Sequence, residues 1–274
     1  MINTFKTCMI KLLPIIFVLL FPMTAFCQKA IMVRSEDSCH PGTGSDNRKD
    51  ILGAAGQEFP FNGIVHIGKN KGNDWGTGAF ISTDEIITAR HVAKGLHNLE
   101  LIQYTEGNMI DIYLSRGDFE VYYDHNYGNA TDHDLAIIRI TDPSKIKALA
   151  NFIFKIADYN TLWAQINSPV HLSGFPFDKA DKDQYRKPYP VDTLSDKSTT
   201  IDKLLFNPAK TMMGYPLYSC SGDSGAPVWV KIGPDYFIIG VHEGYKNGAV
   251  ADNDYNICTL INKSEYDWIL NLTH

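Results

Sequence analysis

The chain has 274 residues, of which 44% are hydrophobic, 20% charged and 12% aromatic. That balance is typical of a folded protein and excludes disordered, collagen-like and coiled-coil chains. Its 25 basic and 31 acidic residues give a formal net charge of -6. No run of Lys or Arg marks a surface for binding phosphates, so we expect no nucleic-acid partner.

The first 27 residues have the pattern of a secretory signal peptide. Two lysines precede an apolar run from Leu12 to Phe21, and Ala25 and Cys27 stand at the small-residue positions of a signal-peptidase site. The run is shorter than the roughly 20 apolar residues of a membrane-spanning helix. We therefore expect residues 1–27 to be removed and the protein to be secreted, extracellular or periplasmic, with no membrane partner. The alternative is a lipoprotein acylated at Cys27, although the bulky Phe26 precedes that position.

Residues 28–57 are polar and lack the periodicity of a strand or helix, which is typical of a pro-segment and an extended N-terminal arm. The following part, residues 58–150, contains short runs of β-branched and aromatic residues bounded by Gly, Asn and Asp. Such runs predict the antiparallel strands of a first β-barrel. The runs are Gly63 to Ile67, Gly78 to Ile81, Glu85 to Thr88, Leu99 to Gln103, Asp111 to Leu114, Phe119 to Tyr123 and Leu135 to Ile140.

Residues 151–274 contain a second set of such runs and predict a second β-barrel. The charge-rich stretch from Asp178 to Ser198 indicates a solvent-exposed loop, and Lys263 to Leu272 has the apolar spacing of a C-terminal helix packed on the outside. The sequence therefore predicts an all-β fold in two halves, closed by one helix. The strand runs of the second half are Pro169 to Ser173, Thr211 to Tyr215, Ala226 to Lys231, Tyr236 to Val241 and Ile257 to Ile261.

Three residues have the pattern of a catalytic triad. Ser224 lies in the string GDSGAPV between two predicted strands, His91 follows the run IITAR, and Asp134 begins the run DLAIIRI. A Ser hydroxyl is a poor nucleophile at neutral pH and needs a base within hydrogen-bond distance and a third group to orient that base. His91, Asp134 and Ser224 can supply these parts.

The order of these residues separates the candidate folds. An α/β-hydrolase has the order Ser, Asp, His, and subtilisin-like enzymes have Asp, His, Ser. The order here is His, Asp, Ser, and Ala226 occupies the place of the second Gly in a nucleophile elbow. Among these folds, only the two-barrel serine proteases fit. Asp132 is a competing carboxylate, His133 is expected to be a loop residue, and Asp223, if buried, needs a cation or several N–H donors.

The chain resembles the glutamyl endopeptidase branch of the chymotrypsin-like, or trypsin-like, serine proteases. The resemblance implies one peptidase unit of two antiparallel six-stranded β-barrels with the catalytic groups between them. It implies Ser224 as nucleophile, His91 as general base, Asp134 as the residue that orients His91, and the backbone N–H groups of Gly222 and Ser224 as the oxyanion hole. The pieces that carry it are GSDNR, FPFNGIVHI, GTGAFIS, ITARHV, DHDLAIIRI, HLSGFPFDK, YSCSGDSGAPVW, IIGVHEG and INKSEYDWIL.

The same resemblance implies which peptide bond is cut. Tyr218 stands where trypsin-like enzymes carry a carboxylate for Lys or Arg, while Ser219 and His242 stand where glutamyl endopeptidases donate hydrogen bonds to a substrate carboxylate. We therefore expect a serine endopeptidase that cuts polypeptides after Glu, and after Asp less well. Glu243 and Arg90 depart from the pattern of the branch. The alternatives are small-apolar or aromatic specificity, and a catalytically silent binding module.

Five cysteines occur, and Cys8 and Cys27 would leave with the signal peptide. Export favours an oxidised pair among the remaining three. The fold implied by the resemblance brings the strand of Cys220 beside that of Cys258, which predicts a disulfide between them. Cys39 would then be free or removed with the pro-segment.

The resemblance of GSDNR places the maturation cut between Cys39 and Gly44; cleavage after Asp50 is the alternative. No zinc-binding spacing occurs, and the Asp-rich stretch from Asp178 to Asp183 matches no calcium pattern. We therefore predict no metal and no cofactor, and expect a monomer.

Overall fold

The computed structural model describes residues 39, 48–51, 60–69, 75–105, 108–124, 133–149, 152–163, 166, 168–176, 194–200, 203–247 and 254–273. The expected signal peptide and most of the expected N-terminal arm lie outside these residues. Residues 34–274 belong to one compact unit. Within the described ranges, no helix has the length and apolar character needed to cross a membrane.

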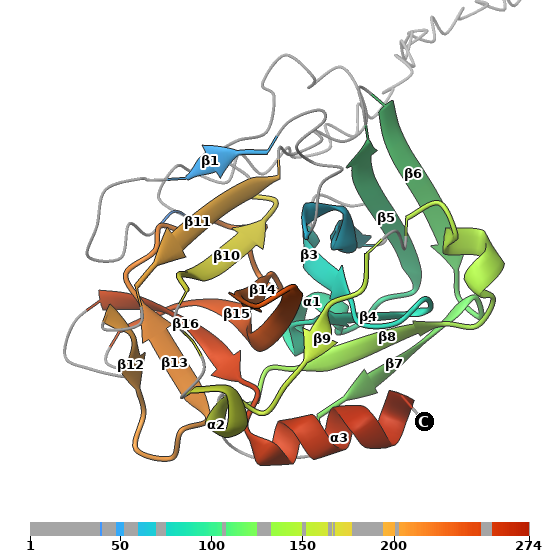
Figure 1. Ribbon diagram of the computed structural model, residues 1–274. Helices are drawn as coiled ribbons and strands as arrows, with labels where there is room; N and C mark the ends of the chain where they lie inside the picture. The colour runs from blue at the N-terminus through green and yellow to red at the C-terminus, as the bar shows by residue number, and fades with distance from the viewer. Residues whose placement is uncertain are drawn as a thin grey trace, which may run out of the picture. The chain divides into compact units, whose positions relative to one another are not determined.

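The first half of the described chain is one curled antiparallel sheet (Figure 1). The predicted runs of residues 63–140 each fall in a strand of this sheet, because their alternating β-branched side chains pack well on a pleated surface. In spatial order, the seven strands are β6 (Asn108–Ser115), β5 (Asn98–Thr105), β2 (Ile64–Lys69), β3 (Trp75–Phe80), β4 (Glu85–Thr88), β8 (Ala136–Ile140) and β7 (Phe119–Tyr123).

The second half forms a nine-stranded sheet, in which β9 pairs with β15 in parallel and all other pairs are antiparallel. Three of its strands, β1, β9 and β12, have only two residues, and the six longer strands form the predicted second barrel. The path is β1 (Lys49–Asp50), β11 (Ser195–Thr199), β10 (Val170–Gly174), β14 (Pro227–Ile232), β15 (Asp235–Asn247), β16 (Asp254–Leu260), β13 (Met212–Tyr215) and β12 (Leu205–Phe206), with β9 (Lys155–Ile156) beside β15.

Helices are few and short, and the predicted C-terminal helix is confirmed as the longest of the described ones. Figure 1 shows it alongside β7 and β8, where Ile269 is buried and Arg139 of β8 donates to the carbonyl of Leu272. The fold is therefore the predicted all-β architecture closed by one helix. The helices are η3 (Phe61–Gly63), α1 (Arg90–Ala93), η4 (Pro143–Ile146), α2 (Tyr159–Leu162) and α3 (Lys263–Thr273).

β14 joins the two hydrophobic cores. Val228 and Val230 are buried among residues of the second barrel, while Trp229 belongs to the cluster that contains the core of the first barrel. Alternate side chains of a strand point to opposite faces, so one strand can enter both cores. The Trp229 indole also donates to Ser173 Oγ at 2.9 Å. The strand that follows Ser224 is thus held from both sides.

The prediction of a solvent-exposed loop from Asp178 to Ser198 is wrong for its last part. Residues 195–199 form β11, and Lys197 in its centre is 1% exposed. A charged residue can be buried when it has a buried partner of opposite charge. Lys197 has such a partner in Asp223, so the high charge density of this stretch did not indicate exposure. Residues 178–193, including the Asp-rich stretch, lie outside the described residues.

The predicted disulfide between Cys220 and Cys258 is wrong. Cys220 is bonded to Cys39, and Cys258 is a buried free thiol. Cys258 lies within β16, opposite His242 of β15 and Met213 of β13, whereas Cys220 lies in the loop after β13 that faces the N-terminal arm. Cys39 is therefore not free. A maturation cut after Cys39 would not remove it, because the disulfide would keep it attached to Cys220.

We expect Cys39→Ser and Cys220→Ser each to lower the free energy of unfolding by about 2–5 kcal/mol, because the bond constrains a long loop of the unfolded chain. Chemical unfolding measures this effect. Mass spectrometry of an unreduced digest should show a peptide pair joined through Cys39 and Cys220, with Cys258 alkylated only after unfolding. A pair joined through Cys220 and Cys258 would contradict the assignment.

Candidate active site

His91 and Asp134 are brought together by two neighbouring strands of the first barrel. His91 lies in α1 just after β4, and Asp134 lies just before β8, which pairs with β4. His91 Nδ1 is hydrogen-bonded to Asp134 Oδ2, and the His91 backbone N–H donates to Oδ1 at 2.8 Å. Both carboxylate oxygens thus hold one residue, which orients the imidazole and leaves Nε2 toward the exposed side.

The backbone of Asp134 is fixed from both barrels. Its carbonyl accepts from the Arg90 N–H at 3.2 Å, and its N–H donates to Thr259 Oγ1 of β16 at 3.0 Å. The Arg90 guanidinium carbon lies 4.9 Å from the centre of the Tyr123 ring. Arg90 therefore departs from the family pattern without disturbing the pair, because its side chain stacks on a neighbouring strand.

Ser224 lies in a tight loop of the second barrel that packs on β3 and β4 of the first. Gly225 has a φ of +85°, and a Cβ there would lie 2.2 Å from both Thr77 O and Thr88 Oγ1. Only a residue without a side chain fits this approach. The Thr77 N–H donates to Ser224 O at 2.8 Å, and Thr77 Oγ1 donates to Gly222 O at 2.8 Å. Thr77 therefore joins the nucleophile loop to the barrel that carries His91.

The loop leaves two backbone donors open. Gly222 has a φ of +97°, and within the described residues neither the Gly222 N–H nor the Ser224 N–H makes a hydrogen bond. An open N–H pair beside a hydroxyl is what an oxyanion hole requires. Gly222, Ser224 and His91 line one cleft, which has a volume of about 230 Å³. Its other lining residues are Lys69, Trp75, Val92 and Ser221.

The Ser224 hydroxyl is not bonded to His91 here. Its Oγ donates to the carbonyl of Glu243 at 3.3 Å, and the described residues show no hydrogen bond between Ser224 and His91. The side chain of Glu243 is held by Thr259, whose Oγ1 donates to Glu243 Oε1 at 2.5 Å. Thr259 is the residue that also accepts from Asp134. Glu243 and Asp134 are thus linked through the same hydroxyl, Thr259 Oγ1.

Asp223 has the buried cation that the sequence led us to expect. Lys197 Nζ lies 2.5 Å from Asp223 Oδ2, both side chains are fully buried, and the Cys220 N–H donates to the same oxygen at 3.0 Å. Asp50 pairs with Ser195 in the sheet, on the strand that carries Lys197. Lys197 thus supplies a cation for Asp223 Oδ2, while Asp223 Oδ1 is buried and has no hydrogen-bond partner among the described residues.

His242 is buried beside Tyr215. Its Nδ1 lies 2.5 Å from the Tyr215 hydroxyl, and that hydroxyl lies 3.3 Å from the carbonyl of Ile257. Burial, with a smaller contribution from the charge of Lys197, holds the pKa of His242 well below its usual value. Burial likewise raises the pKa of Tyr215 well above 10.0. At neutral pH the pair is therefore a neutral imidazole and a protonated phenol.

The other two predicted substrate-binding residues have partners within the protein. Ser219 Oγ donates to Asn256 Oδ1 at 2.7 Å, so its hydroxyl must turn to reach a ligand. The Tyr218 ring lies 4.3 Å from the guanidinium carbon of Arg48, which also donates to Cys220 Sγ at 3.6 Å. The N-terminal arm therefore reaches the loop that precedes Ser224.

Sequence reasoning missed four supporting residues. Arg48 and Thr77 stand inside the matched pieces GSDNR and GTGAFIS, but nothing in those strings shows which side chain matters. Lys197 stood in a predicted loop, and Thr259 has no motif at all. His133 does not take part in the triad but contacts two carboxylates, and Asp132 lies outside the described residues.

Comparisons with known proteins identify the family and the fold. A family model described as Trypsin matches residues 52–269. No curated protein sequence matches the chain. Among solved structures, a Glu endopeptidase in complex with MPD has a TM-score of 0.57 and 17% sequence identity, over 84% of this chain and 98% of that chain. At that identity the likeness establishes the fold.

We expect Lys197→Met to destabilise the protein by about 3–5 kcal/mol and to remove activity, because it leaves the Asp223 charge buried and unpaired next to the oxyanion loop. Lys155→Met is the matched control. It breaks an exposed ion pair with Asp235 and should cost about 0–1 kcal/mol. Unfolding curves and active-site titration measure both effects. Full activity in folded Lys197→Met would show that the pair does not shape the loop.

Proposed function

Because the chain belongs to the trypsin family, we propose that it is a serine endopeptidase that hydrolyses peptide bonds with Ser224, His91 and Asp134. One observation carries the proposal. Asp134 holds the His91 imidazole through Oδ2 and the His91 backbone N–H through Oδ1, and this imidazole shares a cleft with the Ser224 hydroxyl and with two backbone N–H groups that are open among the described residues. Base, nucleophile and oxyanion donors are the parts that acyl transfer needs.

The reaction begins when the Ser224 side chain turns from the Glu243 carbonyl toward Nε2 of His91. His91 takes the hydroxyl proton as Oγ attacks the scissile carbonyl carbon, and Asp134 stabilises the imidazolium that forms. The carbonyl oxygen becomes an oxyanion and accepts from the N–H groups of Gly222 and Ser224. His91 then gives its proton to the leaving amine, and water releases the acyl group by the same steps.

We further propose that the enzyme prefers Glu before the scissile bond, with Asp second. His242 and its partner Tyr215 support this assignment. The phenol stays protonated, and its one hydrogen can go to the Ile257 carbonyl or to Nδ1. When it goes to Nδ1, the neutral imidazole carries its own hydrogen on Nε2 and can donate to a carboxylate. Ser219 adds a second donor once its hydroxyl turns away from Asn256. Small-apolar or aromatic specificity is the alternative, because neither donor is charged.

Arg48 adds positive charge where an acidic substrate needs it. Its guanidinium stacks on Tyr218, six residues before Ser224, where trypsin-like enzymes carry a carboxylate for basic substrates. A cation in place of that carboxylate disfavours Lys and Arg and favours Glu. The disulfide of Cys39 holds the arm that carries Arg48 near this place, and a disulfide also fits export to an oxidising compartment.

A cleavage map of a denatured protein, read by mass spectrometry, tests the mechanism. Cuts should fall after Glu and should decrease at least about 10⁴-fold in Ser224→Ala, because the nucleophile is lost while the fold stays. Equal cutting by wild type and mutant would point to a contaminating protease. Cuts that vanish in the mutant but follow Leu, Phe or Ala would leave the mechanism intact and overturn the acidic specificity.

Substrates that differ only before the scissile bond test the specificity residues. His242→Leu should lower kcat/KM for a Glu substrate roughly 10- to 100-fold and leave an Ala substrate nearly unchanged, since a carboxylate loses a donor. His242→Gln should restore part of the loss. Arg48→Gln should cost about two- to fivefold for Glu, with exposed Arg116→Gln as the control. A parallel loss on both substrates would indicate a structural role.

A further inference from the structure

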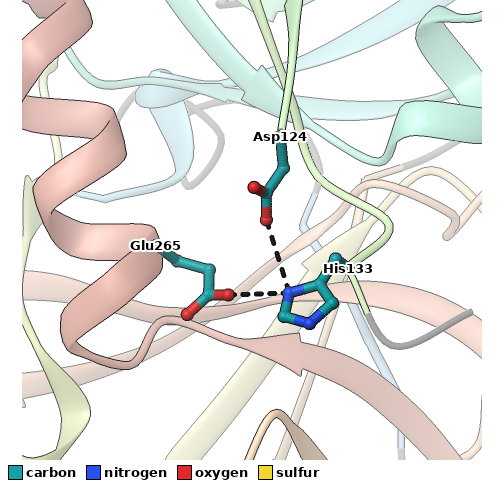
Figure 2. Close-up of side chains that lie close together, drawn as sticks. All are labelled: Asp124, His133 and Glu265. Atoms are coloured by element: carbon teal, nitrogen blue, oxygen red, sulfur yellow. Dashed lines mark hydrogen bonds and ion pairs between the residues drawn. The ribbon is translucent and has the colours of Figure 1, made fainter. Parts of the chain in front are cut away.

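A second cluster of titratable side chains lies next to the triad carboxylate. Asp124 follows β7, His133 immediately precedes Asp134, and Glu265 lies in the first turn of α3; Figure 2 shows the three side chains converging. His133 Nδ1 lies 2.7 Å from Glu265 Oε1 and 3.5 Å from Asp124 Oδ2. The proposed proteolytic mechanism uses none of these groups.

The cluster places two buried carboxylates around a single imidazole. The side chains of Asp124 and Glu265 are fully buried, and the single imidazole between them can carry at most one positive charge. In addition, Glu265 Oε2 is buried and has no hydrogen-bond partner among the described residues. Buried carboxylates are costly unless they are paired or bind a metal. The cluster therefore gathers two acidic side chains around one imidazole, and Glu265 Oε2 has no hydrogen-bond partner among the described residues.

We propose that Asp124, His133 and Glu265 bind a divalent transition-metal cation, with Zn²⁺ as the best fit. One donor atom from each residue lies within 4.8 Å of the others. One imidazole and two carboxylates are ligands that Zn²⁺ accepts, whereas Ca²⁺ takes six to eight oxygens and Mg²⁺ demands an octahedron of oxygens. The cation would take the place of the hydrogen between His133 Nδ1 and Glu265 Oε1. His133, 16% exposed, leaves a side from which the ion can enter.

This site revises our expectation of no metal. Asp124 and His133 stand at the two ends of the connection between β7 and β8, and Glu265 follows His133 by 132 residues, so no short zinc-binding spacing could reveal the set. A bound ion would join the ends of the connection between β7 and β8 to the C-terminal helix. It would also fix the residue next to Asp134, whose N–H donates to Thr259 from the other barrel. The site would thus stabilise the part of the fold that positions the catalytic carboxylate.

Calorimetric titration of the full chain carrying Ser224→Ala, which prevents self-digestion, tests the proposal after dialysis against a chelator. Zn²⁺ should bind once per chain, and Ca²⁺ should not compete. At a Zn²⁺ concentration of 100 Kd, the melting temperature should rise by about 5–10 °C. Glu265→Gln and Asp124→Asn, which keep the shape of each side chain, should each weaken binding at least about tenfold.

His171→Gln is the matched control, because His171 faces a single carboxylate, Asp196, and should bind Zn²⁺ no differently from the parent. Binding that survives in both Glu265→Gln and Asp124→Asn would overturn the site. Binding lost instead in His91→Ala would assign the ion to the catalytic imidazole and also overturn it. No heat and no thermal shift with Zn²⁺ would leave a proton as the occupant of the cluster and refute the proposal. None of these outcomes bears on the Ser224 mechanism.

Discussion

The buried ion pair between Lys197 and Asp223 is the interaction on which the active-site loop depends. A lysine and a carboxylate without solvent contact are stable only together, because each alone would pay a large desolvation cost. The pair fixes β11 against the residue that precedes Ser224. It also places a permanent positive charge near His242, which helps to keep that imidazole neutral. The Lys197–Asp223 pair thus affects the loop that positions the N–H groups of Gly222 and Ser224. It also affects the imidazole of His242, which we propose to select the substrate.

The second constraint is that the residues of the proposed triad come from different barrels. His91 and Asp134 belong to the first barrel and Ser224 to the second. The proposed catalysis therefore requires the two barrels to keep a fixed position relative to each other. Three contacts meet this need: Thr77 bonded to the Ser224 loop, Thr259 bonded to Asp134, and Trp229 packed in the core of the first barrel. The absence of a side chain at Gly225 allows the close approach. The cleft is therefore a product of the interface between the barrels.

Sequence reasoning found the strands and predicted the triad because both leave local patterns. Runs such as Glu85 to Thr88 are continuous in the chain, and a Ser in GDSG is recognised from its neighbours. It failed where the cause is a contact between distant segments. Lys197 looked exposed because its partner lies 26 residues away, Cys220 was paired with the wrong cysteine, and the Asp124, His133 and Glu265 cluster had no motif. Polar residues that are buried in pairs cannot be told from surface residues by composition alone.

In the uncut chain, the bond between Cys39 and Cys220 keeps the N-terminal arm next to the loop around Ser224. A tethered group acts at a high effective concentration, so Arg48 needs little affinity of its own to stay on Tyr218. A cut between Cys39 and Gly44 would leave Cys39 bonded to that loop, but it would end the covalent link between Cys39 and Arg48. Arg48 would then depend on its own contacts with Tyr218. The tether forms only where thiols are oxidised, so the arm is secured only after the chain has left a reducing compartment. The disulfide between Cys39 and Cys220 would then be present only in molecules that have reached an oxidising compartment.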